Sequence, residues 1–175
     1  MSNIFLISDQ HYNHKNFLNF LDEAGNKIRP FTDVEEMDEY MIFCHNSVVK
    51  PQDKVYFLGD VCFNKKTLDI IMPRLNGTKV LIKGNHDNLK LTQYQEYFKD
   101  VRASHQLDKY VLSHIPLHPD HMGRWANGCI HGHLHQCKVM KDGVEDPNYI
   151  NVSVECINYT PISLEELKKK CPGKQ

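Results

Sequence analysis

Short apolar runs recur along the chain, and each is bounded by polar or turn-forming residues. Runs of this length that are rich in Ile, Val, Leu, Phe and Tyr are typical of strands buried on both faces. The sequence therefore predicts strands over Ile4–Ser8, Val55–Leu58, Val80–Lys83, Tyr110–Ser113 and Tyr149–Val154.

Helical patterns lie between the predicted strands in the first half of the chain. From Val34 to Val48, apolar residues recur at steps of three and four and form one stripe along a helix. Thr32 and Glu35 have the spacing of a capping box at its start. Because strands alternate with helices in the first half and follow one another in the second, the pattern predicts an α/β sandwich with mixed sheets. Further helices are predicted over Thr67–Leu75, over Leu91–Phe98 and, from the spacing of Ser163 and Glu166, near the C-terminus.

Composition narrows the class of protein. The chain has 175 residues, which fits a single domain over residues 1–175. Its formal net charge is -1, so no global basic field points to extended nucleic acid as a partner. No apolar run is long enough to span a membrane, and the start lacks the basic region of a signal peptide, so we expect a cytoplasmic protein. None of the six cysteines lies in a C-x-x-C pair, which argues against a zinc ribbon or thioredoxin motif.

Polar clusters of Asp, His and Asn follow the predicted strands. The carboxyl ends of strands are where α/β folds place ligands and catalytic groups. One such cluster would be weak evidence for a site, whereas five are strong evidence. The clusters are Asp9-Gln10-His11, Gly59-Asp60, Gly84-Asn85-His86-Asp87, His114 and His131-Gly132-His133-Leu134-His135.

These residue types indicate metal chemistry. Carboxylate, imidazole and amide oxygen are ligands of divalent Mn, Fe, Zn, Ni or Mg, and the candidates exceed the needs of one ion. A two-metal centre with ions roughly 3.5–4 Å apart fits better, and Asp60 is a natural bridge because a carboxylate has two oxygens. Two divalent ions held by two carboxylates leave a positive site, which attracts phosphate.

The motifs resemble those of the calcineurin-like metallophosphoesterase family, in the same order. The resemblance rests on D-x-H at Asp9–His11, G-D at Gly59-Asp60, G-N-H-D at Gly84–Asp87, a lone His114 and G-H-x-H at Gly132–His135. The surrounding sequence most resembles the small single-domain members found in bacteria and phages. The resemblance implies an αββα sandwich of two mixed β-sheets flanked by helices, with a dinuclear metal site at the strand carboxyl ends.

The resemblance also implies roles for the matching residues. The expected activity is a dinuclear metal-dependent phosphoesterase that hydrolyses phosphodiester bonds by attack of a metal-bridging hydroxide. His86 would be the general acid, and Asp87 would position or charge it. The expected ions are manganese first, with Fe, Zn, Ni or Mg as alternatives. Asp9, His11 and His135 would hold the first metal, Asn85, His114 and His133 the second, and Asp60 would bridge them. His131 matches no ligand position and would support the ligands or pack in the core.

Departures from the family pattern bear on the substrate. The sequence GDVCFNKK lacks the arginine that protein phosphatases carry soon after the G-D motif, which counts against a phosphoprotein substrate. Tyr12 follows D-x-H where many relatives have glycine. Tyr12, His14 and Arg124 are the predicted substrate contacts, although Arg124 has a second interpretation as the partner of a surface carboxylate.

Three functions remain open on the sequence alone. The first is a phosphodiesterase acting on small nucleotide-like or cyclic phosphates, and the second is a phosphomonoesterase acting on a small phosphorylated metabolite. The third is a metal-binding scaffold without activity, but scaffold relatives typically lose ligands or the G-N-H histidine, and both are present here. The sequence leaves open the oligomeric state, the native metals and the roles of His118 and His121.

Overall fold

The computed structural model describes residues 2–122 and 127–170 of the chain. Its larger sheet has the strand order β11-β1-β2-β3-β4, in which β1 to β4 run parallel and β11 is antiparallel to β1. These strands are β1 (Ile4–Ile7), β2 (Lys54–Phe57), β3 (Thr78–Ile82), β4 (Asp100–Arg102) and β11 (Ile162–Ser163).

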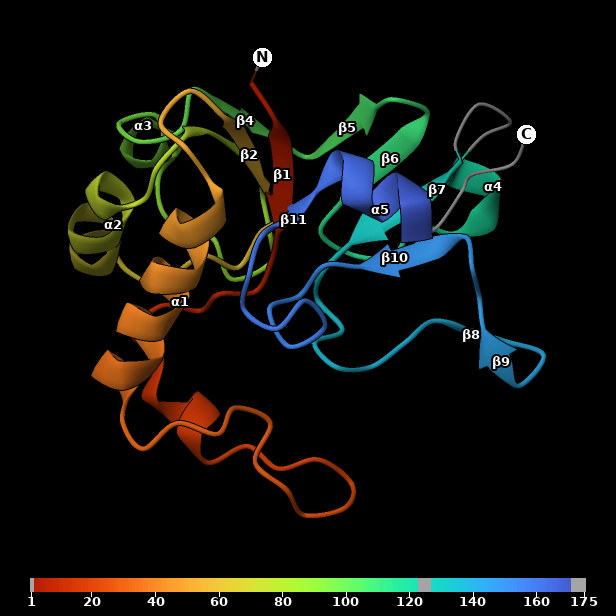
Figure 1. Ribbon diagram of the computed structural model, residues 1–175, viewed down its shortest axis with the longest axis horizontal. Coiled ribbons are helices and arrows are strands. Elements are labelled where there is room, and N and C mark those ends of the chain that lie inside the picture. Colours follow the sequence, from red (N-terminus) through yellow and green to blue (C-terminus); the bar gives the residue numbers. More distant parts are fainter. Residues whose placement is uncertain (1, 123–126, 171–175) are drawn as a thin grey trace.

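A smaller sheet has the strand order β10-β7-β6-β5. In it β10, β7 and β6 run parallel, and β5 is antiparallel to β6. Its strands are β5 (Ser104–Leu107), β6 (Tyr110–Ser113), β7 (Gly128–His131) and β10 (Tyr149–Asn151). A separate two-stranded ribbon of β8 (Met140–Lys141) and β9 (Val144–Glu145) projects beside β10 (Figure 1).

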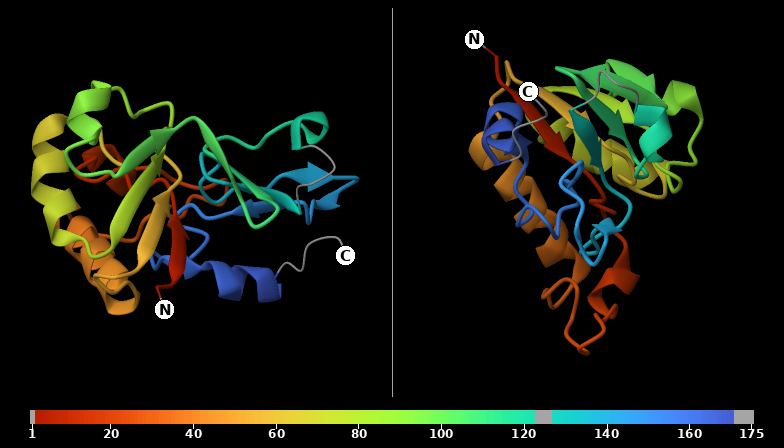
Figure 2. Two further views of the ribbon diagram at one scale, coloured as in Figure 1. Left: turned by 90° about the horizontal axis from the view of Figure 1, so that it is seen from above. Right: turned by 90° about the vertical axis from the view of Figure 1, so that its right-hand side faces the viewer.

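The helices α1 (Val34–Val48), α2 (Lys65–Ile71) and α3 (Leu91–Tyr94) cover the outer face of the larger sheet, and the smaller sheet lies on its other side, as Figure 1 and the turned views of Figure 2 show. Side chains that alternate along β1 explain this layering: Phe5 and Ile7 belong to the helix-facing core, whereas Leu6 belongs to the core shared by the two sheets. The other helices are α4 (Pro119–Met122) and α5 (Leu164–Lys170), with 3-10 turns η1 (Lys15–Leu18) and η2 (Met72–Arg74). None of the helices in residues 2–122 and 127–170 is long and apolar enough to cross a membrane.

The two sheets are joined where β1 and β10 end. Beyond their last strand residues, Ser8 and Ser153 form a parallel bridge, in which Ser8 N donates to Val152 O and Val154 N donates to Ser8 O, both at 3.0 Å. The carboxyl ends of parallel strands from both sheets therefore meet at one edge of the molecule. Every loop that the sequence marks as polar leaves a strand near this edge.

The predicted fold class, two mixed sheets flanked by helices, is confirmed, and the differences lie at element ends. The helix α1 has the predicted bounds, but its N-cap is Asp33, whose side chain accepts from Glu36 N at 2.8 Å. The predicted capping box of Thr32 and Glu35 is therefore wrong by one residue, because Thr32 binds the Glu36 carboxylate instead. At the last helix, Ser163 Oγ accepts from Glu166 N at 3.1 Å, as the spacing predicted.

A buried histidine, His45, lies on the inner face of α1. Its side chain is fully buried, its Nε2 contacts Asn76 O at 3.0 Å, and its ring stacks on Phe57. Burial lowers the pKa of His45 to about 4. The folded protein therefore holds this imidazole neutral at pH values where the unfolded chain binds a proton.

Because of His45, the free energy of unfolding is expected to decrease as the pH falls. As the pH drops from 6.5 to about 4, the unfolded state gains a proton that folded His45 does not. His45 then lowers the free energy of unfolding by up to about 1.4 kcal/mol per pH unit. His45→Gln lacks this effect, so the stability gap between the unaltered protein and the variant should narrow as the pH falls. Urea unfolding of both proteins in chelator at several pH values measures it, and parallel curves would contradict the assignment.

Candidate metal centre

Two groups of Asp and His side chains gather at the edge where the sheets join. In each group the nitrogen and oxygen atoms that could bind a metal ion lie within 4.8 Å of one another. The groups come from the loops that follow β1, β2, β6 and β7, which is why the joined strand ends bring them together. The first cluster is Asp9, His11 and His135, and the second cluster is Asp60, His114 and His133.

The carboxylate of Asp60 lies between the two clusters. Its Oδ2 is 3.6 Å from His11 Nε2 in the first cluster and 3.4 Å from His114 Nε2 in the second. The amide oxygen Oδ1 of Asn85 lies 2.9 Å from the same His114 Nε2. The structure thus brings all seven predicted ligand residues together, with the Asp60 carboxylate close to a histidine of each cluster.

The backbone at this site is left-handed at five of the seven predicted ligand positions, with φ between 49° and 67°. Asp, Asn and His tolerate this conformation better than other side chains, but it still costs on the order of 1–3 kcal/mol per residue. The conformation also directs side chains: in a strand His133 and His135 would share a face, whereas here they join different clusters. The left-handed residues are Asp9, His11, Asp60, His133 and His135.

Two glycines let the loops approach the carboxylates closely. A Cβ atom on Gly84 would lie 2.2 Å from Asp60 Oδ1, and a Cβ on Gly132 would lie 2.2 Å from Asp9 Oδ2 and 2.0 Å from Ser8 Oγ. These contacts are far inside van der Waals distance, so both positions require glycine. The glycines of the G-N-H and G-H-x-H motifs therefore have a steric role beside the ligands.

Unpaired buried atoms fit a bound cation at the first cluster. Asp9 Oδ1 and both ring nitrogens of His11 are buried without a hydrogen-bond partner. A buried polar group without a partner is costly, and a metal ion would satisfy Asp9 Oδ1 and one of the two ring nitrogens of His11. Burial lowers the pKa of His11 to about 2, which keeps its imidazole in the neutral form that binds metal. Burial also raises the pKa of Asp9, and the neighbouring His135 and His114 offset part of that rise.

In the second cluster, Asp60 and His114 each stabilise the charged form of the other. Burial alone would lower the pKa of His114, but the hydrogen bond and charge of Asp60 and the charge of Asp9 outweigh it and raise the pKa. Burial would raise the pKa of Asp60, yet its contact with His114 lowers it below the ordinary value. His114 Nδ1 lies 2.7 Å from Leu58 O, which leaves Nε2 as the nitrogen that faces the carboxylate.

A buried ion pair between Arg29 and Glu155 contacts residues of the first cluster, and the sequence analysis did not identify it. The Arg29 guanidinium is fully buried and donates to Asp9 O at 2.6 Å, to Gln10 O at 2.7 Å and to Glu155 Oε1 at 2.8 Å. Glu155 Oε1 in turn lies 3.1 Å from His135 Nδ1. The His135 contact and the Arg29 charge lower the pKa of Glu155 to about 2, against the effect of burial. Arg29 thus fixes the backbone that carries Asp9, and Glu155 orients the His135 ring.

Only one of these two residues had a signal in the sequence. Glu155 follows the predicted strand Tyr149–Val154, as the ligand clusters follow theirs, and so could have been included among the candidates. Arg29 lies in the loop between η1 and α1, outside every motif, and nothing in its neighbourhood distinguishes it.

Asp87 has a different place from the one predicted. Its Oδ2 accepts from Asp60 N at 2.9 Å and Gly84 N at 2.8 Å, and its Oδ1 accepts from Val61 N at 3.1 Å. Both oxygens are thus used to bind the loop after β2 to the loop after β3. The prediction that Asp87 positions or charges the His86 ring is wrong, because the carboxylate is buried in this loop junction. His86 itself is exposed, and its backbone N donates to Asp60 Oδ1 at 2.8 Å.

The predicted substrate contacts divide three ways. Tyr12 is 1% exposed and belongs to the helix-facing core, so the prediction that it contacts substrate is wrong. His14 is half-buried beside His11, with ring centroids 5.9 Å apart, and stays a predicted contact. Arg124 lies outside the described residues.

His131 ends β7 as a buried residue beside Tyr149, which agrees with a packing role.

Solved structures resemble this chain in fold. A protein of unknown function, AQ665 from Aquifex aeolicus, overlays with a TM-score of 0.72 over 97% of this chain and 100% of that chain, at 24% sequence identity. The phosphopantetheinyl hydrolase PptH from Mycobacterium tuberculosis overlays with a TM-score of 0.46 over 87% of this chain and 89% of that chain, at 13% identity. The likeness to AQ665 shows the fold of this chain, and it extends over the entire length of AQ665.

Sequence comparison gives a closer relationship. No family model matches the chain. The uncharacterized protein MJ1445 of Methanocaldococcus jannaschii is 37% identical over 174 residues, a match that covers 97% of this chain and 91% of the relative. At this identity over nearly the whole of both chains, the protein belongs to the same family as MJ1445.

Proposed function

We propose that the protein is a phosphodiesterase of the calcineurin-like metallophosphoesterase type, with two divalent metal ions and a small nucleotide-like substrate. The observation that carries the proposal is the double use of one carboxylate. Asp60 Oδ2 faces both Asp/His clusters, and Asp60 Oδ1 accepts the backbone N–H of His86. The residue proposed as general acid is therefore fixed to the residue proposed as bridge.

The donor set suits two divalent ions. Asp9, His11 and His135 would hold one ion, Asn85, His114 and His133 the other, and Asp60 both. Carboxylate, imidazole and amide oxygen without thiolate favour manganese, iron, zinc, nickel or magnesium, and we propose manganese. When bound, such ions lower the pKa of a shared water and stabilise negative charge on a phosphate ester.

The charge of the surrounding chain favours an anionic substrate. Asp9 and Asp60 balance only half the charge of two divalent ions, because their other ligands are neutral. Glu155 does not change this balance, since Arg29 Nη2 pairs with it at 2.7 Å behind the first cluster. The open side of the site thus attracts a phosphate group.

His86 is placed to transfer a proton at the open side. It is exposed, whereas His11 and His114 are buried, and its ring centroid lies 5.6 Å from that of His11. A phosphate ester held by the clusters would place its leaving oxygen toward solvent, where the His86 ring can donate a proton to it. The tether between His86 N and Asp60 limits the positions that this ring can reach.

A diester is favoured over a monoester by the supply of fixed cations. A monoester carries one more negative charge at neutral pH, and enzymes neutralise such charge with arginine or lysine side chains. Within residues 2–122 and 127–170, the arginine recorded next to the clusters is Arg29, which is fully buried and used by Glu155 and backbone carbonyls. With a shared hydroxide, two divalent ions and two carboxylates would leave one positive charge uncompensated, which a singly charged phosphodiester balances without a further cation.

A paired assay tests the proposal. Manganese-loaded protein should hydrolyse bis-p-nitrophenyl phosphate faster than p-nitrophenyl phosphate. Asp60→Ala removes the shared ligand, so it should lose both bound metal and activity in the same preparation. Preference for the monoester would replace the proposal with a phosphomonoesterase. If neither substrate is hydrolysed although two ions are bound, a metal-binding scaffold is favoured. Full metal occupancy in Asp60→Ala would exclude Asp60 as the bridging ligand.

His86→Ala should lower turnover by about 10²–10⁴-fold while both metals stay bound, because the variant removes a proton donor and leaves the ligands in place. The loss should be largest for substrates whose leaving group is a poor one. His105→Ala is the matched control, because it changes a histidine on β5 whose ring contacts Tyr56 and Arg102 rather than a cluster residue. An unchanged rate for a poor leaving group in His86→Ala would remove this residue from the role of acid.

Glu155→Gln should weaken one of two metal-binding events by about 10–100-fold, because the amide orients and polarises His135 less than the carboxylate does. Calorimetric titration of the metal-free protein with Mn²⁺ measures the two events separately. Glu145→Gln, which alters an exposed glutamate paired with Lys138, is the control and should bind as the unaltered protein does. Equal weakening of both events would show that Glu155 acts on the fold as a whole.

A further inference from the structure

Aromatic rings stand exposed beside the metal centre. Phe63, in the loop after β2, is 38% exposed, and Phe20, after η1, is 42% exposed. His14 lies between them, with ring centroids 4.6 Å from Phe63 and 6.3 Å from Phe20. We name the surface formed by His14, Phe20 and Phe63 the aromatic wall.

The aromatic wall borders the reacting groups proposed above. The Phe63 ring centroid lies 5.0 Å from that of His86, the proposed acid, and 5.5 Å from that of His11 in the first cluster. A group attached to a phosphate held by the clusters would therefore come within contact distance of Phe63 as it leaves. The wall and the proposed acid share one side of the centre.

The rings are held in place by the fold. Phe17 is 4% exposed and packs against both His14 and Phe20, with the Arg29 guanidinium 4.0 Å from its centroid. The segment that carries His14 is bound to the segment that carries Phe63, because Tyr12 N donates to Val61 O at 2.9 Å. A rigid exposed ring can stack on a flat ligand without losing much conformational freedom.

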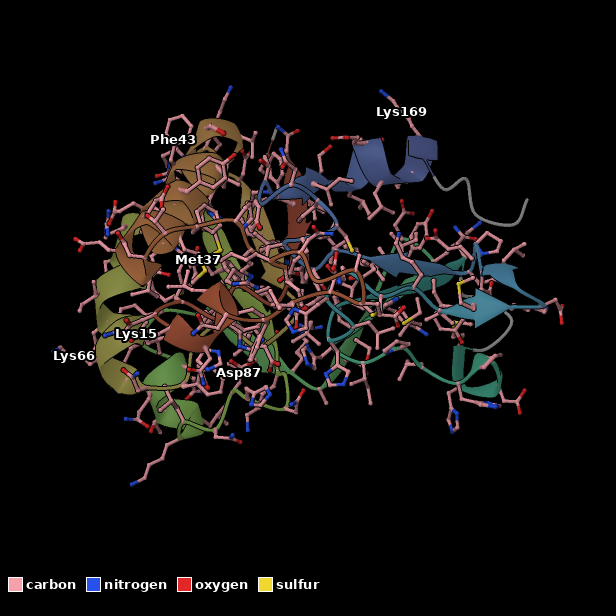
Figure 3. All side chains as sticks on the ribbon, turned by 90° about the horizontal axis from the view of Figure 1, so that it is seen from below. Lys15, Met37, Phe43, Lys66, Asp87 and Lys169 are labelled. Atoms are coloured by element: carbon pink, nitrogen blue, oxygen red, sulfur yellow. The ribbon has the colours of Figure 1, made fainter. Side chains whose placement is uncertain are left out.

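Exposure alone would mean little, because single exposed apolar residues are common on protein surfaces. Phe43 on α1, for example, is 69% exposed, and Figure 3 shows it on the outer side of the helix, well away from Asp87 and the loops of the centre. The aromatic wall differs because several rings gather at one place and that place adjoins the metal clusters. Gathered exposed apolar surface of this kind marks binding sites.

The chemistry of the aromatic wall selects one class of group. A second phosphate would need fixed cations, and Arg29, the arginine recorded behind this surface in the described part of the chain, lies against buried Phe17 and is neutralised by Glu155. A sugar would need several hydrogen-bond partners, whereas this wall offers π-faces and one imidazole. Flat, uncharged aromatic groups stack on such faces.

We propose that the aromatic wall is a subsite for a nucleobase of the substrate, with Phe63 as the residue that determines this specificity. The proposal rests on the proposed function and narrows its substrate to esters in which a nucleoside is attached to the reacting phosphate. Phe63 stacks on the base, while His14 and Phe20 extend the surface on which the base lies.

Two ligands that differ only in the base test the subsite. Calorimetry on manganese-loaded protein would compare adenosine 5′-monophosphate with ribose 5-phosphate, which has the same phosphate and sugar. We expect the nucleotide to bind about 5- to 100-fold more tightly, the range that base–aromatic stacking supplies. Phe63→Leu keeps an apolar side chain without a π-face and should reduce this ratio to about 3 or less, whereas Phe63→Trp should retain it.

Controls separate the subsite from the fold and from the proposed function. Phe43→Leu makes the same change on the outer side of α1 and should leave the ratio unchanged, and melting temperatures check that the variants are folded. Equal affinity of the two ligands in the unaltered protein would overturn the subsite while leaving the phosphate site intact. A full ratio in Phe63→Leu would also overturn it. Failure of both ligands to bind while bis-p-nitrophenyl phosphate is hydrolysed would also overturn the subsite, whereas failure of both to bind with no hydrolysis of that diester, with two manganese ions present, would overturn the proposed function itself.

Discussion

The candidate centre depends on the backbone junction at Ser8 and Ser153. Parallel strands of one sheet can bring their ends together, but the two clusters draw residues from both sheets, and this junction aligns the two edges. The same residues also serve the ligands directly, because Ser153 Oγ donates to Asp9 Oδ2 at 2.9 Å and Ser8 Oγ contacts Leu58 O. Main-chain hydrogen bonds thus align the two sheet edges, while the side chains of Arg29 and Asp87 hold the loops that carry the ligands.

The site concentrates arrangements that would be unfavourable elsewhere. Left-handed turns at ligand positions and unpaired buried atoms at Asp9 and His11 each reduce the stability of the metal-free protein. The large cores on both faces of the larger sheet and the Arg29–Glu155 pair compensate for them. A bound cation would satisfy Asp9 Oδ1 and one ring nitrogen of His11, so cation binding would stabilise the folded chain.

Much of this arrangement could be predicted from the sequence, and the failures have physical reasons. Strand runs and the polar residues after them are local signals, so the fold class and the gathering of the seven ligand candidates were predicted correctly. Asp87 and Tyr12 were assigned by their nearness to motifs, but burial turned Asp87 toward backbone amides and Tyr12 into the core. Arg29 contacts the site only through the tertiary fold, and no local sequence pattern predicts such a contact.

The pairing of β1 with β11 has a consequence for synthesis on the ribosome. The strand β1 has β2 on one side, but its other side is covered by Ile162–Ser163, which is synthesised much later. Until the last part of the chain is made, the growing polypeptide presents an unpaired, apolar strand edge of the kind that recruits other chains. A chaperone that shields this edge until Ile162–Ser163 has been synthesised would therefore raise the yield of native protein.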